Sequence, residues 1–227
     1  IIFDMDGTLV RPVIDFGEMR RRIYSVGSRD FNTTINSGCV LELTERLSPR
    51  AQQEATRILQ EIEQDAIDRM AFMDGMMDLC RWLDECNLKR AVLTRNVERS
   101  VDALHDKLQL SPFHPAVARN TIHPHLQTNI APKPHPDAIH YICERWNCSP
   151  EHVIMVGDSL KDDVVAASRA GCASVFLDNG KDNCSGNEED SRPEERQPTL
   201  AVSSLSELHD VLIALYQDQH VCQESQV

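Results

Sequence analysis

The chain opens with Ile1-Ile2-Phe3-Asp4-Met5-Asp6-Gly7-Thr8-Leu9, in which an apolar, β-prone run leads into two carboxylates. Side chains two residues apart in a strand point the same way, so we expect Asp4 and Asp6 to face one spot. At the carboxyl end of a strand, that spot is where open α/β sheets bind ligands. Gly7 permits the sharp turn out of the strand. The alternative interpretation is a turn without a chemical role, because Asp and Gly are common where strands end.

Two carboxylates this close repel each other, so both stay ionised only beside a cation or with one of them protonated. The pair therefore suits a hard, oxygen-seeking cation such as Mg²⁺. It also offers one carboxylate as a nucleophile and the other as a general acid and base. The opening stretch thus predicts a catalytic metal site.

The composition is that of a globular protein with an excess of acidic residues. The 227 residues carry a formal net charge of −13, and this length corresponds to one or two domains. The acidic balance argues against nucleic acid and anionic membranes as partners. A small phosphorylated substrate stays compatible with it, because a local cation and a few donors reverse the potential within one cleft. We expect a monomer or a homodimer.

The eight cysteines include no Cys-x-x-Cys pair, which argues against a zinc ribbon or a thioredoxin-like motif. We expect free, mostly buried thiols in a reducing intracellular compartment, that is, the cytoplasm or an organelle stroma or matrix. An extracellular disulfide framework is the alternative. Ile1 stands only three residues before Asp4 and is not methionine, so we expect that an N-terminal segment was removed by processing or is missing, and that any targeting signal lay there.

Residues 12–71 are predicted to form a helical module inserted after the first strand. Apolar residues recur at helical spacing after Asp15, and a longer stripe follows Ser48-Pro49, where serine suits the N-cap and proline the first helical position. A crossover between parallel strands usually needs one helix, so this length argues for a separate module. The alternative is that these are ordinary crossover helices.

Strands and helices alternate over residues 72–217. The predicted strands in this part lie at 90–94, 116–118, 153–156, 173–177 and 200–202. Together with residues 1–11 they indicate a mostly parallel sheet with helices on both faces, that is, a three-layer, doubly wound, Rossmann-like α/β fold. Residues 178–198 are predicted as a polar loop, and residues 218–227 as a frayed tail.

Polar residues follow three of the predicted strands. Besides Asp4 and Asp6, they are Thr94-Arg95-Asn96, Gly157-Asp158-Ser159-Leu160-Lys161-Asp162-Asp163 and, between these, the proline-braced lysine of Ala131-Pro132-Lys133-Pro134-His135-Pro136. One sheet edge thus receives carboxylates, a hydroxyl, a lysine and backbone N–H groups. Such a set suits phosphoryl chemistry, because a cation and donors neutralise the phosphate oxygens while a carboxylate attacks in line.

The order Asp-x-Asp-Gly-Thr, three apolar residues and Thr, Lys-Pro, and Gly-Asp-Ser-x-x-Asp resembles the haloacid dehalogenase (HAD) superfamily, in particular its phosphoglycolate-phosphatase-like branch with the plant HAD-like hydrolases. The motifs span residues 1–178. The resemblance implies a HAD core, and it makes the module at 12–71 a C1 cap that closes over the site and selects the substrate. It also implies a Mg²⁺-dependent phosphatase for a small phosphorylated metabolite, of the phosphoglycolate or sugar phosphate class.

The resemblance assigns roles to the matching residues. Asp4 would be the nucleophile that forms an aspartyl-phosphate, and Asp6 the general acid that protonates the leaving oxygen and then the base that activates water. Thr94 and the next backbone N–H would bind the phosphate, and Lys133 would neutralise both the phosphate and Asp4. An acid at Asp6 favours phosphate esters over dehalogenation, since a halide leaves without a proton.

For the metal, the resemblance implies Asp158 and Asp4 as ligands, with the main-chain carbonyl of Asp6. Asp162 matches the second acid of its motif and would support the same site. Asp163 follows one residue later, and an acid at a helix N-terminus explains it sufficiently.

The resemblance implies Thr94 and Lys133 as substrate contacts through the phosphate. Arg95 and Asn96 are predicted as further substrate contacts because they directly follow Thr94. Two other functions stay open. A phosphomutase of the β-phosphoglucomutase type uses the same core and the same two aspartates, and it differs in a cap that must hold a bisphosphate and reorient it. The other is a non-catalytic binding protein on this fold.

Overall fold

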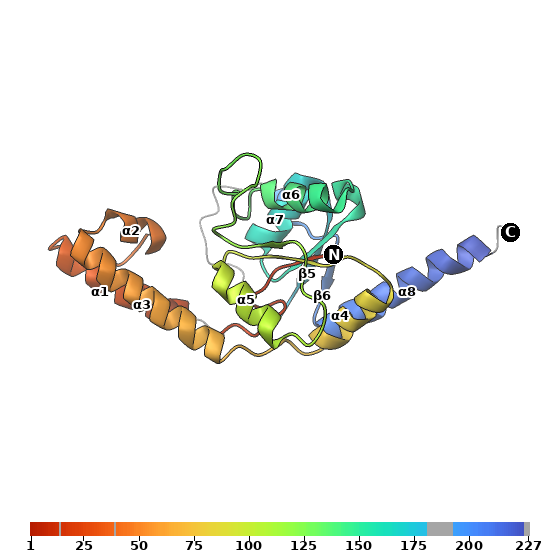
Figure 1. Cartoon of the computed structure of the whole chain (residues 1–227), viewed down its shortest axis with the longest axis horizontal. Coiled ribbons are helices and arrows are strands. Elements are labelled where there is room, and N and C mark those ends of the chain that lie inside the picture. The colour runs from red at the N-terminus through yellow and green to blue at the C-terminus, as the bar shows by residue number, and fades with distance from the viewer. Residues whose placement is uncertain (14, 39, 181–192, 225–227) are drawn as a thin grey trace. The chain divides into compact units, whose positions relative to one another are not determined.

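The computed structural model describes residues 1–227 except 14, 39, 181–192 and 225–227 (Figure 1). The chain divides into two compact units. The first comprises Ile1–Arg11 and Ala71–Val227, and the second comprises Pro12–Met70. The second unit lies where the sequence predicts the helical module.

The first unit is built on a parallel sheet of six strands within the described residues, in the order β3-β2-β1-β4-β5-β6. The strands are β1 (Ile2–Phe3), β2 (Ala91–Leu93), β3 (Ala116–Val117), β4 (Ile154–Gly157), β5 (Ala173–Leu177) and β6 (Leu200–Val202). Ile2 of β1 pairs with Ala91 of β2 on one side and with Met155 of β4 on the other. The order of the strands therefore reverses between β1 and β4, which is where doubly wound sheets bind ligands. The predicted doubly wound parallel fold is confirmed.

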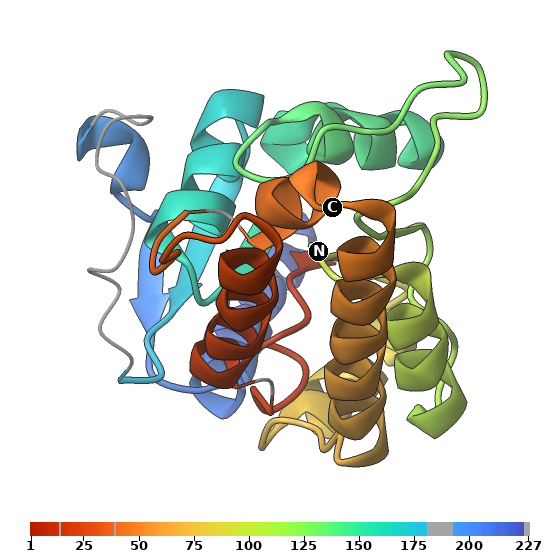
Figure 2. The same ribbon diagram turned by 90° about the vertical axis from the view of Figure 1, so that its left-hand side faces the viewer.

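Helices cover both faces of this sheet. They are α4 (Met76–Glu85), α5 (Glu98–Lys107), α6 (Asp137–Trp146), α7 (Val165–Ala170) and α8 (Leu205–Glu224), with the short turns η1 (Pro150–His152), η2 (Leu160–Val164) and η4 (Pro193–Arg196). In Figure 1, α6 and α7 lie on one side of the sheet and α4 and α5 on the other, and Figure 2 shows the same layers turned by 90°. Ile139, Ile142 and Ala166 pack against Ile2 and Met155 in the core under α6 and α7. With both faces buried, polar side chains gather at the strand ends.

Within its described residues, the second unit consists of α1 (Phe16–Asp30), α2 (Val40–Arg46) and α3 (Pro49–Asp68). The side chain of Asp15 caps α1, because it accepts a hydrogen bond from Glu18 N at 2.8 Å. Ser48 stands at the N-cap of α3 as predicted, but its hydroxyl bonds Asp30 instead of the helix. The core of this unit is formed by Ile23, Val26, Leu43, Leu47, Ala51, Ala55 and Ile58.

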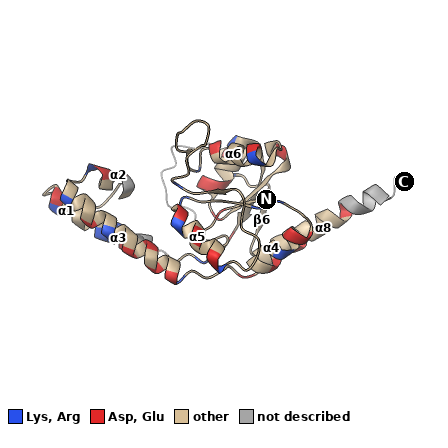
Figure 3. Ribbon diagram, in the orientation of Figure 1, with Lys and Arg blue, Asp and Glu red and all other residues tan. Residues whose placement is uncertain are grey.

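Charged residues of both signs occur along α1 and α3 (Figure 3). Arg22 pairs with Glu61 at 2.8 Å, and Arg29 pairs with Glu54 at 2.7 Å. All four side chains are substantially exposed, and exposed ion pairs contribute only about 0.2–1 kcal/mol each. The stability of this unit therefore comes mainly from its apolar core.

Two segments differ from their prediction. α8 continues to Glu224, whereas the sequence predicts that the helix ends at Tyr216 and that residues 218–227 fray. No glycine or proline interrupts residues 217–224, so nothing local ends the helix. In the predicted loop over 178–198, Pro193–Arg196 forms a 3₁₀ turn, and the stretch 181–192 lies outside the described residues.

Two further findings concern the chain as a whole. Among the described residues, no helix has the length and apolar character needed to cross a membrane. The cysteines that the structure describes as unpaired are Cys80, Cys86, Cys143, Cys148 and Cys172. Free thiols are thus found at these positions, as predicted, while the compartment and the oligomeric state stay predictions.

Candidate active site

Neighbouring strands end at one edge of the sheet, where backbone hydrogen bonds tie their last residues together. Asp4 N donates to Val156 O at 2.8 Å, and Thr94 N donates to Val117 O at 2.9 Å. After Asp4 the chain turns sharply through Gly7, whose φ of 83° favours glycine. The predicted site residues that follow β1, β2 and β4 are thereby brought together.

A buried lysine bridges two buried carboxylates at this edge. Lys133 Nζ lies 2.5 Å from Asp4 Oδ1 and 2.5 Å from Asp163 Oδ1. The side chains of Lys133 and Asp163 are 3% and 2% exposed. Removing charges from water is costly even when they are paired, so a buried ion pair is weak evidence for stabilisation. This cluster is therefore a candidate for function rather than for stability.

The cluster has unusual protonation properties. Burial raises the pKa of Asp163 to about 7, against the opposing effect of the Lys133 charge. Burial also raises the pKa of Asp4, and Lys133 again opposes the shift. For Lys133 itself, burial lowers the pKa, but Asp163 and Asp4 outweigh burial and hold it above its ordinary value. Lys133 is therefore a permanent positive charge at the carboxylates.

Asp158 completes a group of three carboxylates. One oxygen from each of Asp4, Asp158 and Asp163 lies within 4.8 Å of the other two. Three carboxylates against one lysine leave excess negative charge in a mostly buried place, which a divalent cation would neutralise. All the donors are oxygen atoms, as Mg²⁺ requires. The residues present thus fit the predicted cation, and they are the ones that would hold it.

The structure separates the two adjacent acids Asp162 and Asp163. Asp162 Oδ2 accepts a hydrogen bond from Arg95 Nη1 at 3.0 Å, away from the group of three, whereas Asp163 bonds Lys133. The sequence had predicted Asp162 as the supporting metal residue and had explained Asp163 as an acid at a helix N-terminus. The geometry brings Asp163 to the cluster instead.

The surroundings of Asp163 hold its side chain at the cluster. Asp163 lies in η2, directly before α7, and its side chain is buried. Gly157 permits the close approach, because a Cβ at this position would lie 2.2 Å from Asp163 Cγ. Ser159 N also donates to Asp163 Oδ2 at 3.0 Å, which fixes the carboxylate from the backbone.

The three residues after β2 reach in different directions. Thr94 is buried, and its Oγ1 accepts a hydrogen bond from Asn96 N at 3.0 Å. Arg95 is more than half exposed and pairs with Asp162. Asn96 Nδ2 donates to Asp6 Oδ2 at 2.5 Å. The predicted phosphate-binding, substrate-binding and acid–base residues thus lie in one connected group.

Asn179 is a site residue that the sequence analysis missed. Its Nδ2 donates to Asp158 Oδ2 at 3.0 Å and to Gly7 O at 3.2 Å. It therefore links the turn after β1 to the acid after β4. Asn179 follows β5 closely, and a polar residue just after a strand is the signal in the sequence that points to it.

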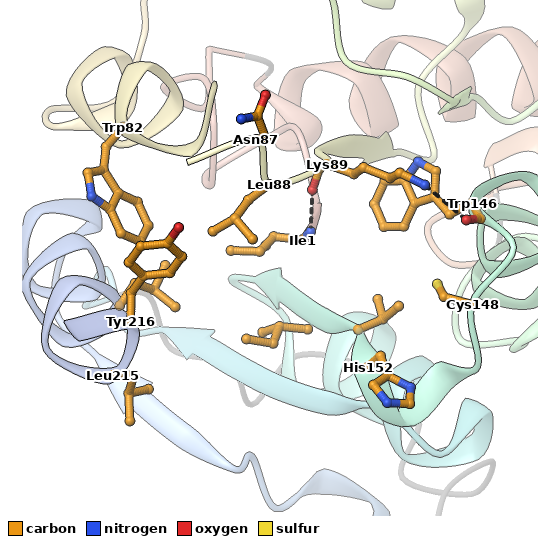
Figure 4. Close-up of a pocket in the computed structure, with 13 residues that line it drawn as sticks. Ile1, Trp82, Asn87, Leu88, Lys89, Trp146, Cys148, His152, Leu215 and Tyr216 are labelled. Carbon is orange, nitrogen blue, oxygen red and sulfur yellow. Dashed lines mark hydrogen bonds between the residues drawn. The ribbon is translucent and has the colours of Figure 1, made fainter. Parts of the chain in front are cut away.

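A pocket of about 490 Å³ lies at the opposite, amino ends of the strands (Figure 4). Ile1 and Val153, which precede β1 and β4, line it together with the rings of Trp82, Trp146 and Tyr216. Its lining includes no carboxylate and none of the site residues above. The pocket is therefore separate from the carboxylate cluster and does not suit phosphoryl chemistry.

The amino-acid sequence is similar to those of known hydrolases. A family model for haloacid dehalogenase-like hydrolases matches residues 1–171. A haloacid dehalogenase-like hydrolase domain-containing protein of Arabidopsis thaliana is 36% identical over 218 residues, which are 93% of this chain and 82% of that protein. A phosphoglycolate phosphatase of Haemophilus influenzae is 30% identical over 210 residues, covering 78% of this chain and 84% of the relative.

Solved structures share the fold. A predicted phosphoglycolate phosphatase from Haemophilus somnus superposes with a TM-score of 0.66 at 19% identity, covering 93% of this chain and 96% of that one. A putative β-phosphoglucomutase from Thermotoga maritima gives a TM-score of 0.62, also at 19% identity, and covers 94% and 97% of the two chains. At these identities the likeness concerns the fold alone, and the same fold is found in proteins with two different reaction names.

Proposed function

The chain belongs to the haloacid dehalogenase-like hydrolase family, and we propose that it is a Mg²⁺-dependent phosphomonoester hydrolase with Asp4 as its nucleophile. One observation carries the proposal: Lys133 lies 2.5 Å from both Asp4 and Asp163 in a buried place beside Asp158. A fixed positive charge at a carboxylate beside a candidate cation site is what attack on a phosphate ester needs.

In the first step, a carboxylate oxygen of Asp4 forms a bond to phosphorus while the bond from phosphorus to the leaving oxygen breaks. Asp6 gives its proton to that oxygen. Lys133 and the backbone N–H groups after Thr94 neutralise the phosphoryl oxygens as their charge redistributes. The product of this step is an aspartyl-phosphate on Asp4.

In the second step, water attacks phosphorus and Asp6, now ionised, takes its proton. The bond between Asp4 and phosphorus breaks, and inorganic phosphate leaves. Asp6 is thereby protonated again and ready for the next ester. Two moderate displacements thus replace one difficult displacement by water.

Asp4, Asp158 and Asp163 would hold the cation, whose positive charge would neutralise the phosphate and the carboxylates. A thermal unfolding series with added MgCl₂ or EDTA tests this part. We expect Mg²⁺ to raise the Tm of the wild type, because a ligand that binds only the folded state stabilises it. Asp158→Asn would abolish this shift, whereas Asp162→Asn, the matched change beside the cluster, would retain it. The proposed ligand set would be contradicted if Asp162→Asn lost the Mg²⁺-dependent rise in Tm while Asp158→Asn retained it.

A small phosphorylated metabolite is the proposed substrate, with 2-phosphoglycolate and sugar phosphates as the leading classes. The relative from Haemophilus influenzae named phosphoglycolate phosphatase, which this chain covers to 84%, supports the first class. We further propose that the helical unit Pro12–Met70 acts as the cap that selects the substrate, and Arg95 as a contact for it.

Phosphate release from a panel of phosphomonoesters, with MgCl₂ or with EDTA, tests the reaction. We expect Mg²⁺-dependent turnover that falls at least about a thousand-fold in Asp4→Asn, because the nucleophile is lost. Asp210→Asn makes the same change on the exposed side of α8 and serves as the matched control. Undiminished release by Asp4→Asn would contradict the proposal.

The panel also separates the alternatives. No release from any ester, together with Asp4-dependent interconversion of hexose phosphates primed by a bisphosphate, would favour the mutase. No reaction of either kind would favour a binding role.

A further inference from the structure

Asn96 makes a long-range contact that its place in the sequence does not explain. Its Nδ2 donates a hydrogen bond to Asp6 Oδ2 at 2.5 Å, although the two residues are 90 positions apart. The contact joins the segment after β2 to the turn after β1. It is a short hydrogen bond for an N–H donor and an oxygen acceptor.

Hydrogen bonds hold the backbone N–H and C=O groups of Asn96 in place. Asn96 N donates to Thr94 Oγ1 at 3.0 Å, and Asn96 O accepts from Arg119 N at 2.8 Å. The residue therefore cannot shift without disturbing both contacts. A side chain on such a fixed base can set the orientation of the carboxylate that it touches.

We propose that Asn96 is a positioning residue that orients the Asp6 carboxyl group for proton transfer to and from the ester oxygen. The inference rests on the proposed function, in which Asp6 is the general acid and base. An amide N–H that occupies Oδ2 assigns the transferable proton to Oδ1, because a carboxyl group carries its proton on one oxygen. The donor thereby selects which oxygen faces the leaving group.

This role differs from the substrate contact that the sequence predicts for Asn96. A substrate contact lowers KM or stabilises every ester alike. A positioning residue for the general acid matters only when the leaving group needs a proton. The two roles are therefore separated by the leaving group, which can be varied without changing the protein.

The experiment compares an alkyl phosphate with p-nitrophenyl phosphate, whose nitrophenolate departs without protonation. For Asn96→Ala we expect kcat to fall about ten- to a hundred-fold on the alkyl ester. On the aryl ester we expect a change of less than about three-fold, with KM nearly unchanged on both. Asn96→Gln, which keeps the amide donor, would recover part of the lost rate.

Asn120→Ala is the matched control, since Asn120 is exposed and accepts a hydrogen bond from Glu98 N instead of contacting the site. A double variant adds a second readout. If Asn96 acts through Asp6, Asn96→Ala has little left to remove once Asp6 is already Asn. We then expect kcat of the double variant on the alkyl ester to be less than about three-fold below that of Asp6→Asn alone. Thermal unfolding checks each fold, and if Asn96→Ala does not fold, Asn96→Gln and Asn96→Ser carry the same comparison.

Three outcomes would overturn the inference. Equal losses on both esters, or a raised KM with kcat retained, would make Asn96 a substrate contact. If the losses in kcat caused by Asn96→Ala and Asp6→Asn were fully additive in free energy, the two residues would act independently. In each of these cases the wild type still releases phosphate in an Asp4-dependent way, so the proposed function survives, whereas a wild type without such release would overturn both.

Discussion

The molecule holds pairs of opposite charges in two different settings. At the sheet edge, Lys133 meets Asp4 and Asp163 at 2.5 Å, and the lysine side chain is 3% exposed. On the helical unit, Arg29 meets Glu54 at 2.7 Å, but these side chains are 64% and 42% exposed. The distances hardly differ, whereas the contact with water differs greatly.

Burial, not distance, separates these two kinds of ion pair. In water, each charge exchanges good solvation for a modest attraction, and the net gain is close to zero. In the interior, loss of solvation is costly and is offset only while all partners are present. A buried cluster is therefore sensitive to the loss of any partner, whereas an exposed pair is not.

Lys133→Met should have the largest effect, because it leaves buried carboxylates without their counter-charge. We expect the free energy of unfolding to fall by about 3–5 kcal/mol. Urea denaturation at neutral pH measures it. A loss below about 1 kcal/mol would be no larger than the loss expected for an exposed pair. It would contradict the claim that burial makes this cluster more sensitive.

The pH dependence of stability should carry the signature of Asp163. The pKa of Asp163 is about 7 in the folded protein and 3.8 in its ordinary state. A group with a raised folded pKa contributes stability that is present in full below 3.8 and is lost as the pH rises through about 7. In EDTA, the wild type should therefore lose stability from pH 4 to 7, by at most about 1.4 kcal/mol per pH unit from this group. Asp163→Asn should remove this part of the slope.

Asp30→Asn is the control for that experiment. The hydrogen bonds from Ser48 lower the pKa of the partly exposed Asp30. The contribution of Asp30 to stability is therefore present above its ordinary pKa and is lost only as the pH falls below that value. This variant should therefore keep the wild-type slope between pH 4 and 7. An unchanged slope in Asp163→Asn would mean that the titration belongs to another group.

Gly157→Ala should have a smaller but clear effect. The added Cβ would lie 2.2 Å from Asp163 Cγ, so either the strand or the buried acid must move. We expect a loss of about 1–3 kcal/mol in urea denaturation, together with a weaker Mg²⁺-dependent rise in Tm. In Gly17→Ala on α1, the new Cβ meets only the Asp15 carboxylate at 3.1 Å, so stability should change by less than about 1 kcal/mol. Equal effects of the two variants would contradict the close fit around Asp163.

Arg29→Met should have the smallest effect. It removes an exposed pair, so we expect a loss of about 0.2–1 kcal/mol that shrinks further in 1 M salt. Urea denaturation at low and high salt measures both. A loss of several kcal/mol, independent of salt, would show that exposure does not separate the two kinds of pair.

Much of this protein was predictable because its signals are local. The strand predictions at 90–94, 153–156 and 173–177 hold within a few residues, since short β-branched runs between turn residues indicate strands without tertiary information. The resemblance to the HAD superfamily is confirmed by the family model over residues 1–171, and so is the prediction of a HAD-type phosphatase at the level of the enzyme class. The site roles, the metal and the domain roles stay proposals.

Local sequence patterns set the alternation of strands and helices, and hence the sheet edge at which Asp4, Thr94 and Asp158 gather. Periodicity and turn residues act over a few positions, so this information is present in every short window. The tertiary structure alone decided which acid turns toward Lys133. Adjacent residues on the helical turn η2 point in different directions, so Asp162 and Asp163 are the same residue type but reach different partners. Only tertiary packing, likewise, brings Asn179 to Gly7, a contact that spans 172 residues, because the sheet and not the chain sets that distance.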